Sequence, residues 1–257
     1  MKIFLALVVT SLVLLSTHSH SNDAFKVVED NLRKINNGAF ASAPIKVLGE
    51  VGEPGFEDFY FVSLGGQQII VSSSGEYAIT GDLINLDSRT NLTEEFSRRG
   101  LAEKAKVELA KLSDDDLVIF KGKGEPKGEL FVLTDPTCFY CRKLHGDIDT
   151  LLSAGITVKY VPFPRGVAED GQQPYEQLKQ VMCAENKVDA MDKMKTETDS
   201  GMFVQASYAK ECVDKVLKGK ALGTDLDISG TPFLYLSTGR VVGGYVPPEQ
   251  LLTFFGE

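Results

Sequence analysis

Two cysteines with the spacing Cys-x-x-Cys, Cys138 and Cys141, constrain the fold of this chain more than any other feature. An apolar stretch typical of a buried strand ends at Thr134, and Pro136 prevents the strand from continuing. Cys138 therefore falls where a helix begins, and the free N–H groups and positive end of that helix favour a thiolate and lower its pKa. Cys141, nearly one turn later and deeper, can attack a mixed disulfide formed by Cys138. The sequence predicts a redox-active pair.

The same spacing also occurs in zinc knuckles and in permanent structural disulfides. Zinc would need two further soft ligands at a suitable spacing, and Cys183 and Cys212 lack that pattern. We therefore expect no metal and no other bound cofactor. The strand–Pro–Cys–helix context also favours redox cycling over an inert disulfide.

A second feature, Thr231-Pro232, precedes an apolar stretch 94 residues after Cys138. A proline can begin an edge strand, and a cis bond there would turn the preceding backbone groups outward. Alone, Thr-Pro before a strand indicates a simple turn more often than a cis bond. With a Cys-x-x-Cys helix start upstream we expect the cis form, in which Thr231 offers backbone groups to a substrate strand near Cys138.

The order of elements in the second half of the chain is that of an α/β, thioredoxin-like sheet with a helical insertion. The expected elements are strands at 117–120 and 130–134, a helix at 138–154, a strand at 156–163, a mostly helical region to about 223, a hairpin of 233–237 with 240–242, and a helix at 247–255. We expect this domain to occupy residues 116–257.

The first 21 residues read as a cleavable signal peptide. Lys2 precedes an apolar run, 3–15, that is too short for a permanent transmembrane helix, and small residues at 19 and 21 suit cleavage before Asn22. The alternative is an uncleaved membrane anchor. Without this leader the chain has 26 basic and 36 acidic residues, a formal charge of about −10, which excludes a basic nucleic-acid-binding surface. Export also favours disulfides, and four cysteines allow three pairings.

Residues 22–90 are expected to form a small α+β domain. A helix with apolar residues at 25, 28, 32 and 35 precedes β-prone runs at 59–64, 68–71 and 77–80. So small a sheet has edges to cover, which favours pairing with a second copy. The polar helical stretch that follows, 91–115, with Asn91 as a cap, reads as a linker; an ordinary surface helix of either domain is the alternative.

These motifs together resemble the DsbC family of periplasmic disulfide isomerases. The matching segments are Thr-Asp-x-Thr-Cys-x-Tyr-Cys-x-Lys-Leu-His (134–145), Gly-Ile-Thr-Val-x-Tyr (155–160), Phe-Pro-Arg (163–165), Ser-Gly-Thr-Pro (229–232), Gly-Tyr-x-Pro-Pro (244–248) and, in the N-terminal half, Tyr77-x-Ile79-x-Gly81. The resemblance covers essentially the whole mature chain and is loose before residue 60.

The resemblance implies a V-shaped homodimer, whose cystatin-like N-terminal domains pair through the strand of Tyr77, Ile79 and Gly81. It further implies a structural disulfide between Cys183 and Cys212, a cis Pro232, substrate contacts from Tyr140, Thr231 and Pro232, and reduction of the active pair by a DsbD-like membrane reductase.

Two features of the chain depart from the family. Phe139-Tyr140 separates the active cysteines, where the familiar isomerase has Gly-Tyr and the related DsbG has Pro-Tyr, so the family's redox potential is not transferable. The segment between Cys183 and Cys212 is also longer than expected. The hypothesis is a periplasmic isomerase of exported proteins with wrong disulfides. The rivals are a DsbG-like reductase of oxidised cysteines, a DsbA-like oxidase and a holdase chaperone with incidental cysteines. His145 is either a proton-transfer group or, as we favour, a surface or packing residue.

Overall fold

The computed structural model describes residues 17–196 and 207–256 and divides the chain into two compact units, residues 1–94 and 95–257. The apolar run of the expected signal peptide, 3–15, lies outside the described residues. The expected cleavage point before Asn22 lies within the first helix, which begins at Thr17. Within the described residues, no helix is long and apolar enough to cross a membrane.

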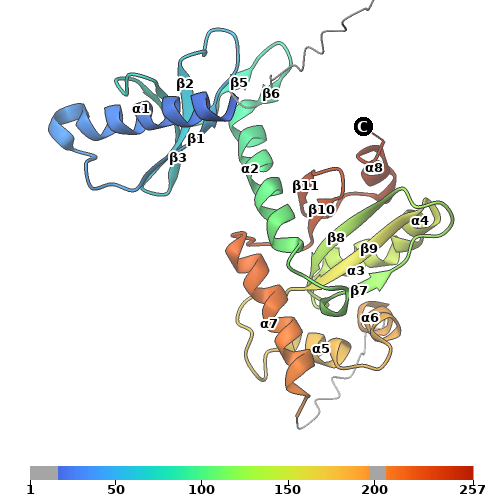
Figure 1. The fold of residues 1–257 in the computed structure, drawn as a ribbon. Helices are drawn as coiled ribbons and strands as arrows, with labels where there is room; N and C mark the ends of the chain where they lie inside the picture. Colours follow the sequence, from blue (N-terminus) through green and yellow to red (C-terminus); the bar gives the residue numbers. More distant parts are fainter. Residues whose placement is uncertain (1–16, 197–206, 257) are drawn as a thin grey trace, which may run out of the picture. The chain divides into compact units, whose positions relative to one another are not determined.

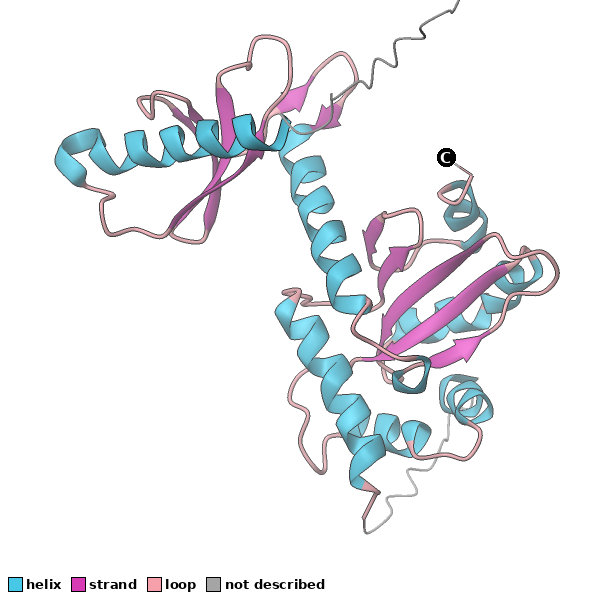
Figure 2. Ribbon diagram, in the orientation of Figure 1, coloured by secondary structure: helices cyan, strands magenta, loops and turns pink. Residues whose placement is uncertain are grey.

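In the first unit, one helix packs on a four-stranded antiparallel sheet of order β1-β2-β3-β4 (Figure 2). The helix buries Val28 and Leu32, one turn apart, against strand residues such as Val62 and Val71. The elements are α1 (Thr17–Gly38), β1 (Ile45–Glu50), β2 (Phe59–Leu64), β3 (Gln67–Ser72), β4 (Ala78–Ile79), and a separate two-stranded pair, β5 (Ile84–Asn85) with β6 (Thr90–Asn91).

The sequence missed β1. Its register on β2 shifts between Val47 and Gly49, so one residue of the strand is left out of the pairing. A shift of this kind breaks the alternation of buried and exposed side chains by which a strand is recognised in a sequence. The burial pattern of β1 loses its strict alternation after Val47.

The second unit is built on a five-stranded mixed sheet of order β11-β10-β8-β9-β7, in which only β8 and β9 are parallel (Figure 1). Its elements are α2 (Leu92–Leu109), a 3-10 turn (Asp114–Asp116), β7 (Val118–Phe120), β8 (Gly128–Thr134), α3 (Phe139–Gly146), α4 (Ile148–Ser153), β9 (Ile156–Pro162), α5 (Gln173–Met182), α6 (Lys187–Thr196), α7 (Lys210–Asp225), β10 (Phe233–Leu236), β11 (Val241–Gly243) and α8 (Pro248–Thr253).

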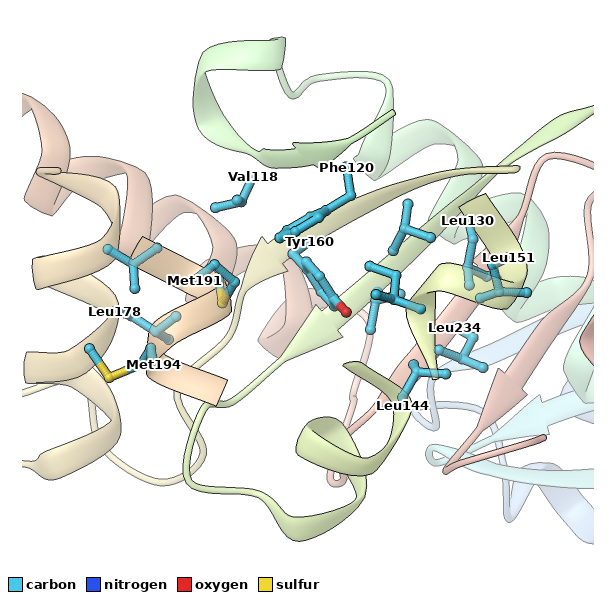
Figure 3. Close-up of a cluster of buried hydrophobic side chains, with 14 of the residues drawn as sticks. Val118, Phe120, Leu130, Leu144, Leu151, Tyr160, Leu178, Met191, Met194 and Leu234 are labelled. Carbon is cyan, nitrogen blue, oxygen red and sulfur yellow. The ribbon is translucent and has the colours of Figure 1, made fainter. Parts of the chain in front are cut away.

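Successive residues of the central strands face two separate cores. Val132 and Tyr160 belong to the core that α3, α4, α5 and α6 cover, which Figure 3 shows, whereas Leu133 and Val161 belong to the core on the opposite face. Because both faces are covered, apolar residues stand at successive positions in these strands, as at 130–133 in β8, which is typical of a parallel α/β sheet. This order of strands and helices is the thioredoxin-like arrangement that the sequence predicted.

One further element differs from the sequence-based expectation. The single helix expected over 138–154 is two helices, α3 and α4, that are interrupted at Asp147, which has non-helical backbone angles of −98° and 3°. The expected linker helix, α2, is capped by Asn91, whose side chain accepts a hydrogen bond from the N–H of Glu94 at 3.0 Å. Its second half buries Ala102, Ala105 and Leu109 in a core of the second unit.

Candidate active site

Cys138 sits at the N-cap of α3, immediately after the end of the central strand β8. The loop between them is held by Asp135, which is fully buried and accepts hydrogen bonds from the Thr137 backbone N–H (2.7 Å) and hydroxyl (2.6 Å). Cys138 has extended backbone angles, and its carbonyl accepts the first helical hydrogen bond, from Arg142 N–H at 3.0 Å. The cysteine therefore lies where the free N–H groups of the helix converge.

The Thr231–Pro232 peptide bond is cis, and it faces Cys138. The Sγ atom of Cys138 lies 3.2 Å from the carbonyl oxygen of Thr231, which accepts the S–H of the thiol form. Cys138 exposes 4 % of its surface and Cys141 exposes none. The structure thus brings Cys138, Cys141, Thr231 and Pro232 together, although 93 residues separate Cys138 from Thr231.

The pKa values of the two thiols are shifted in opposite directions. The pKa of Cys138 is lowered to about 5, chiefly because the Cys141 thiol donates a hydrogen bond to it. The backbone N–H groups of Cys141 and Tyr140 add to this effect, which outweighs the cost of burial. The pKa of Cys141 is raised because it holds that shared proton and is buried. At pH 7 Cys138 is therefore a thiolate, and Cys141 is a protonated thiol held behind it.

We expect the alkylation rate of Cys138 in the reduced protein to rise with pH around a midpoint near 5, because only the thiolate reacts. Iodoacetamide labelling between pH 4 and 9, followed by mass spectrometry, measures it. Cys141→Ala removes the main hydrogen-bond donor and should move the midpoint upward, whereas Cys141→Ser keeps a donor and should move it less. A midpoint near the ordinary thiol value of about 8.5 would contradict this assignment.

Exposed aromatic rings border the cysteines. Phe139 and Tyr140, on the first turn of α3, are 71 % and 53 % exposed, and Tyr140 stacks on Tyr245 with ring centroids 6.3 Å apart. The Tyr245 hydroxyl donates to Asp147 at 2.8 Å, which raises the pKa of Tyr245 to about 12. We call Phe139, Tyr140 and Tyr245 the aromatic strip. It offers apolar surface beside the reactive sulfur atom.

Buried polar groups support the site from below. Asp135 accepts hydrogen bonds from the backbone N–H and from Nε of Arg165, at 2.9 and 3.1 Å. The sequence motifs contained both residues without assigning them a role. His145 is the packing residue that we favoured: its ring is buried and contacts the Tyr160 hydroxyl (3.0 Å) and Asp192 (3.1 Å). Burial lowers the pKa of His145 to about 4, so this side chain is neutral at pH 7.

Lys195, on α6, also lies behind the pair and is buried. No sequence motif indicated a role for it. It stands in a mixed polar and apolar stretch, 54 residues after Cys141, and a lysine is expected at a helix surface. Its position depends on how the helical insertion packs on the sheet, which no local pattern states. Within the described residues, no group of three or more histidine, cysteine or carboxylate side chains is placed to bind a metal.

The other two cysteines, Cys183 and Cys212, form a disulfide that joins the end of α5 to α7, with Cα atoms 5.2 Å apart. It closes the helical insertion, and for a loop of 29 residues the chain-entropy model gives about 3–4 kcal/mol of stabilisation.

In the first unit, Ile79 belongs to β4, which pairs with β3, at the end of the sheet order. Tyr77 precedes that strand and is 67 % exposed, and Gly81 follows it with a φ of 111°.

The thioredoxin-like domain family model matches residues 113–257, and the chain belongs to this family. The thiol:disulfide interchange protein DsbC of Escherichia coli K12 is 28% identical over 190 residues, 74% of this chain and 73% of that protein. The DsbC of Salmonella typhimurium is 35% identical over 144 residues, 56% of each chain. These relatives confirm the resemblance to the DsbC family. Among solved structures, a linker-deletion mutant of ScsC from Proteus mirabilis shares the fold at 16% identity, with a TM-score of 0.52 over 64% of this chain and 85% of that one.

Proposed function

We propose that this thiol:disulfide interchange protein is a disulfide isomerase and reductase that acts on exported proteins with wrong disulfides. One observation carries the proposal: at the start of α3, the Cys138 thiol, with a pKa of about 5, lies 3.2 Å from the Thr231 carbonyl of the cis Thr231–Pro232 peptide. Such a sulfur atom is ionised at pH 7, and the backbone beside it is turned to receive an extended segment of a client.

The reaction is thiol–disulfide exchange. The Cys138 thiolate attacks one sulfur of the client disulfide; a bond forms between the two sulfur atoms, and the second client sulfur leaves as a thiolate. A different client thiolate then attacks the client sulfur of the mixed disulfide; a new client disulfide forms and Cys138 leaves as a thiolate, which completes an isomerisation without net electron transfer. Alternatively Cys141 loses its proton, attacks Cys138 and releases the client as a thiol, leaving the pair oxidised and the client reduced by two electrons.

The aromatic strip supports a protein client over a small thiol. Three rings beside a buried sulfur atom provide apolar contact area for the side chains that flank a client cysteine, as unfolded chains expose them. Phe139 is the largest contributor by exposure, and it stands where the family has glycine or proline. The strip therefore adds apolar surface at the family's variable position.

The test of this function is reactivation of a scrambled protein with several disulfides. With the pair kept reduced, the protein should restore activity of the client faster than glutathione alone does, because it breaks non-native disulfides. A protein that oxidises reduced client but leaves scrambled client inactive would be an oxidase. Suppressed aggregation that survives replacement of both active cysteines would identify a holdase.

We further propose that the protein is a homodimer paired through β4. The edge position of this strand, with the exposed Tyr77 before it, supports pairing with the same strand of a second copy. Light scattering should give twice the mass of one chain, and Tyr77→Asp should shift it toward the monomer at micromolar concentration. Leu86→Asp, an equally drastic change at an 84 % exposed residue of the same unit, is the control. A monomeric mass for the unchanged protein would refute the pairing.

The proposed location is the periplasm, reached through a signal peptide of residues 1–21, and the proposed electron donor is a DsbD-like membrane reductase. An isomerase needs a reduced pair in an oxidising compartment, so some donor must supply electrons. Trapping the thiols in intact cells with and without that reductase measures the redox state directly. A pair that stays reduced without the reductase would exclude it as the donor.

A further inference from the structure

Lys195 carries an ammonium group inside the second unit. The residue is 2 % exposed, and its Nζ donates a hydrogen bond to the hydroxyl of Thr134 at 2.7 Å. The Tyr160 ring lies beneath it, with the centroid 5.2 Å from Nζ. In the described parts of the chain, 17–196 and 207–256, no carboxylate lies within ion-pair distance of this nitrogen. An ammonium buried in this way is costly unless other negative charge stabilises it.

That negative charge is at the active site. Thr134, to which Lys195 donates, is the last residue of β8 and lies four residues before Cys138. In addition, Arg142 Nε on α3 donates to the Lys195 carbonyl at 2.9 Å, and this bond holds α6 against the helix of the two cysteines. Burial lowers the pKa of Lys195 to about 8; the single thiolate charge of the Cys138–Cys141 pair and the charge of Asp135 limit that lowering, while Arg142 adds to it.

The other titratable groups around this position take no part in the redox step. Asp135 also contributes negative charge to Lys195, but it accepts two hydrogen bonds from Arg165 and is not oxidised or reduced, and Asp192, on the same helix as Lys195, is hydrogen-bonded to His145. Tyr160 stays neutral, because burial raises its pKa well above the ordinary value, and His145 is also neutral at pH 7. Oxidation of the pair to a disulfide removes the thiolate charge and leaves the ammonium less stabilised.

We propose that Lys195 is a positioning residue of the disulfide exchange: its ammonium favours the reduced, thiolate form of the Cys138–Cys141 pair, and it gives up a proton when the pair is oxidised. The inference deepens the proposed function and keeps the same site. It also suits an isomerase, which works with its pair reduced.

The step balances with glutathione disulfide as the oxidant. The two cysteine sulfur atoms lose two electrons and form a bond, and glutathione disulfide gains those electrons and becomes two thiols, which take up two protons at neutral pH. Cys141 supplies one proton. Lys195 supplies the second proton when its ammonium is deprotonated to a neutral amine during the oxidation. If Lys195 keeps its proton, the solvent supplies the second proton.

The sign of the pH dependence follows from the two states of Lys195. Its pKa is about 8 in the reduced protein and lower in the oxidised protein, because the thiolate is then absent. At pH values between these two pKa values, the reduced form binds one more proton than the oxidised form. The contribution of Lys195 to the equilibrium in favour of the reduced form is therefore fully present below both pKa values. It falls tenfold per pH unit as the pH rises between them and is lost above pH 8.

The experiment measures the equilibrium of the full-length protein with glutathione from pH 5.5 to 9, with the thiols trapped by alkylation. Lys195→Met should be oxidised at least tenfold more readily than the unchanged protein at pH 6, which corresponds to a reduction potential about 30 mV lower. This difference should shrink to nothing above pH 8. Lys193→Met, an exposed lysine on the same helix, should match the unchanged protein throughout.

Equal equilibrium constants for Lys195→Met and the unchanged protein, or a difference that stays constant through pH 8, would overturn the inference. A second measurement needs no variant: oxidation by glutathione disulfide at pH 7 in weak buffer with a pH indicator should take up clearly less than one proton per pair. Uptake of one full proton would also overturn it. Neither readout involves a client, so failure here leaves the isomerase proposal standing, and failure in the refolding assay leaves this one standing.

Discussion

Replacing Cys138 with serine is expected to reduce the reactivation of a scrambled client to the uncatalysed rate. In the proposed mechanism the thiolate is the attacking group, and a serine hydroxyl cannot replace it, because its pKa is far higher and it does not exchange with a disulfide. The expected loss is complete, and the fold should be unaffected because the substitution keeps nearly the same volume at the N-cap of α3. Client activity followed over time measures the effect.

Cys141→Ser is the matched variant at the other sulfur atom. It removes the resolving thiol and leaves the nucleophile, so mixed disulfides with client proteins should accumulate and be visible as higher-mass species on a non-reducing gel. Isomerisation by client thiols should continue in part, since that route does not use Cys141. Reactivation by Cys138→Ser at the rate of the unchanged protein would refute the mechanism. Mixed disulfides between client proteins and Cys141 in the Cys138→Ser variant would also refute it.

The sequence predicted the parts of the site that local patterns encode. Cys138 and Cys141 stand in a strand–Pro–Cys–helix segment of a dozen residues, and the cis bond at Pro232 follows from a short motif read together with that segment. Both depend on backbone geometry that a few neighbouring residues determine. The roles given to these residues remain predictions for the experiments above.

The polar groups behind the cysteines could not be predicted in the same way. Lys195 reaches Thr134 because the helical insertion packs α6 against β7 and α3, a tertiary arrangement with no local signature. Asp135 and Arg165 meet because β8 and β9 are parallel neighbours, so the residues that follow both strands lie at one edge of the sheet. The interruption between α3 and α4 was missed for a different reason, since residues 138–154 keep a helical apolar pattern through Asp147.

Gly219→Ala is expected to destabilise the fold by about 3 kcal/mol. Gly219 is buried in α7, and a methyl group there would overlap the backbone carbonyl oxygen of Pro162 at the end of β9. Backbone cannot rotate out of the way as a flexible side chain does, so helix and strand must separate and lose their packing. Urea unfolding followed by circular dichroism measures the change.

Gly100→Ala provides the control with the opposite sign. Gly100 is an exposed residue of α2, and outside the helix's own backbone no described atom lies within 4 Å of the added methyl group. The higher helix propensity of alanine should therefore stabilise the protein by about 0.5–1 kcal/mol. If both substitutions stabilised the protein, α7 would not lie this close to β9. The contact also concerns the site: the Phe163 N–H, next to Pro162, donates to the Thr134 carbonyl at 3.0 Å. Folded Gly219→Ala protein should therefore show a Cys138 alkylation midpoint displaced from that of Gly100→Ala.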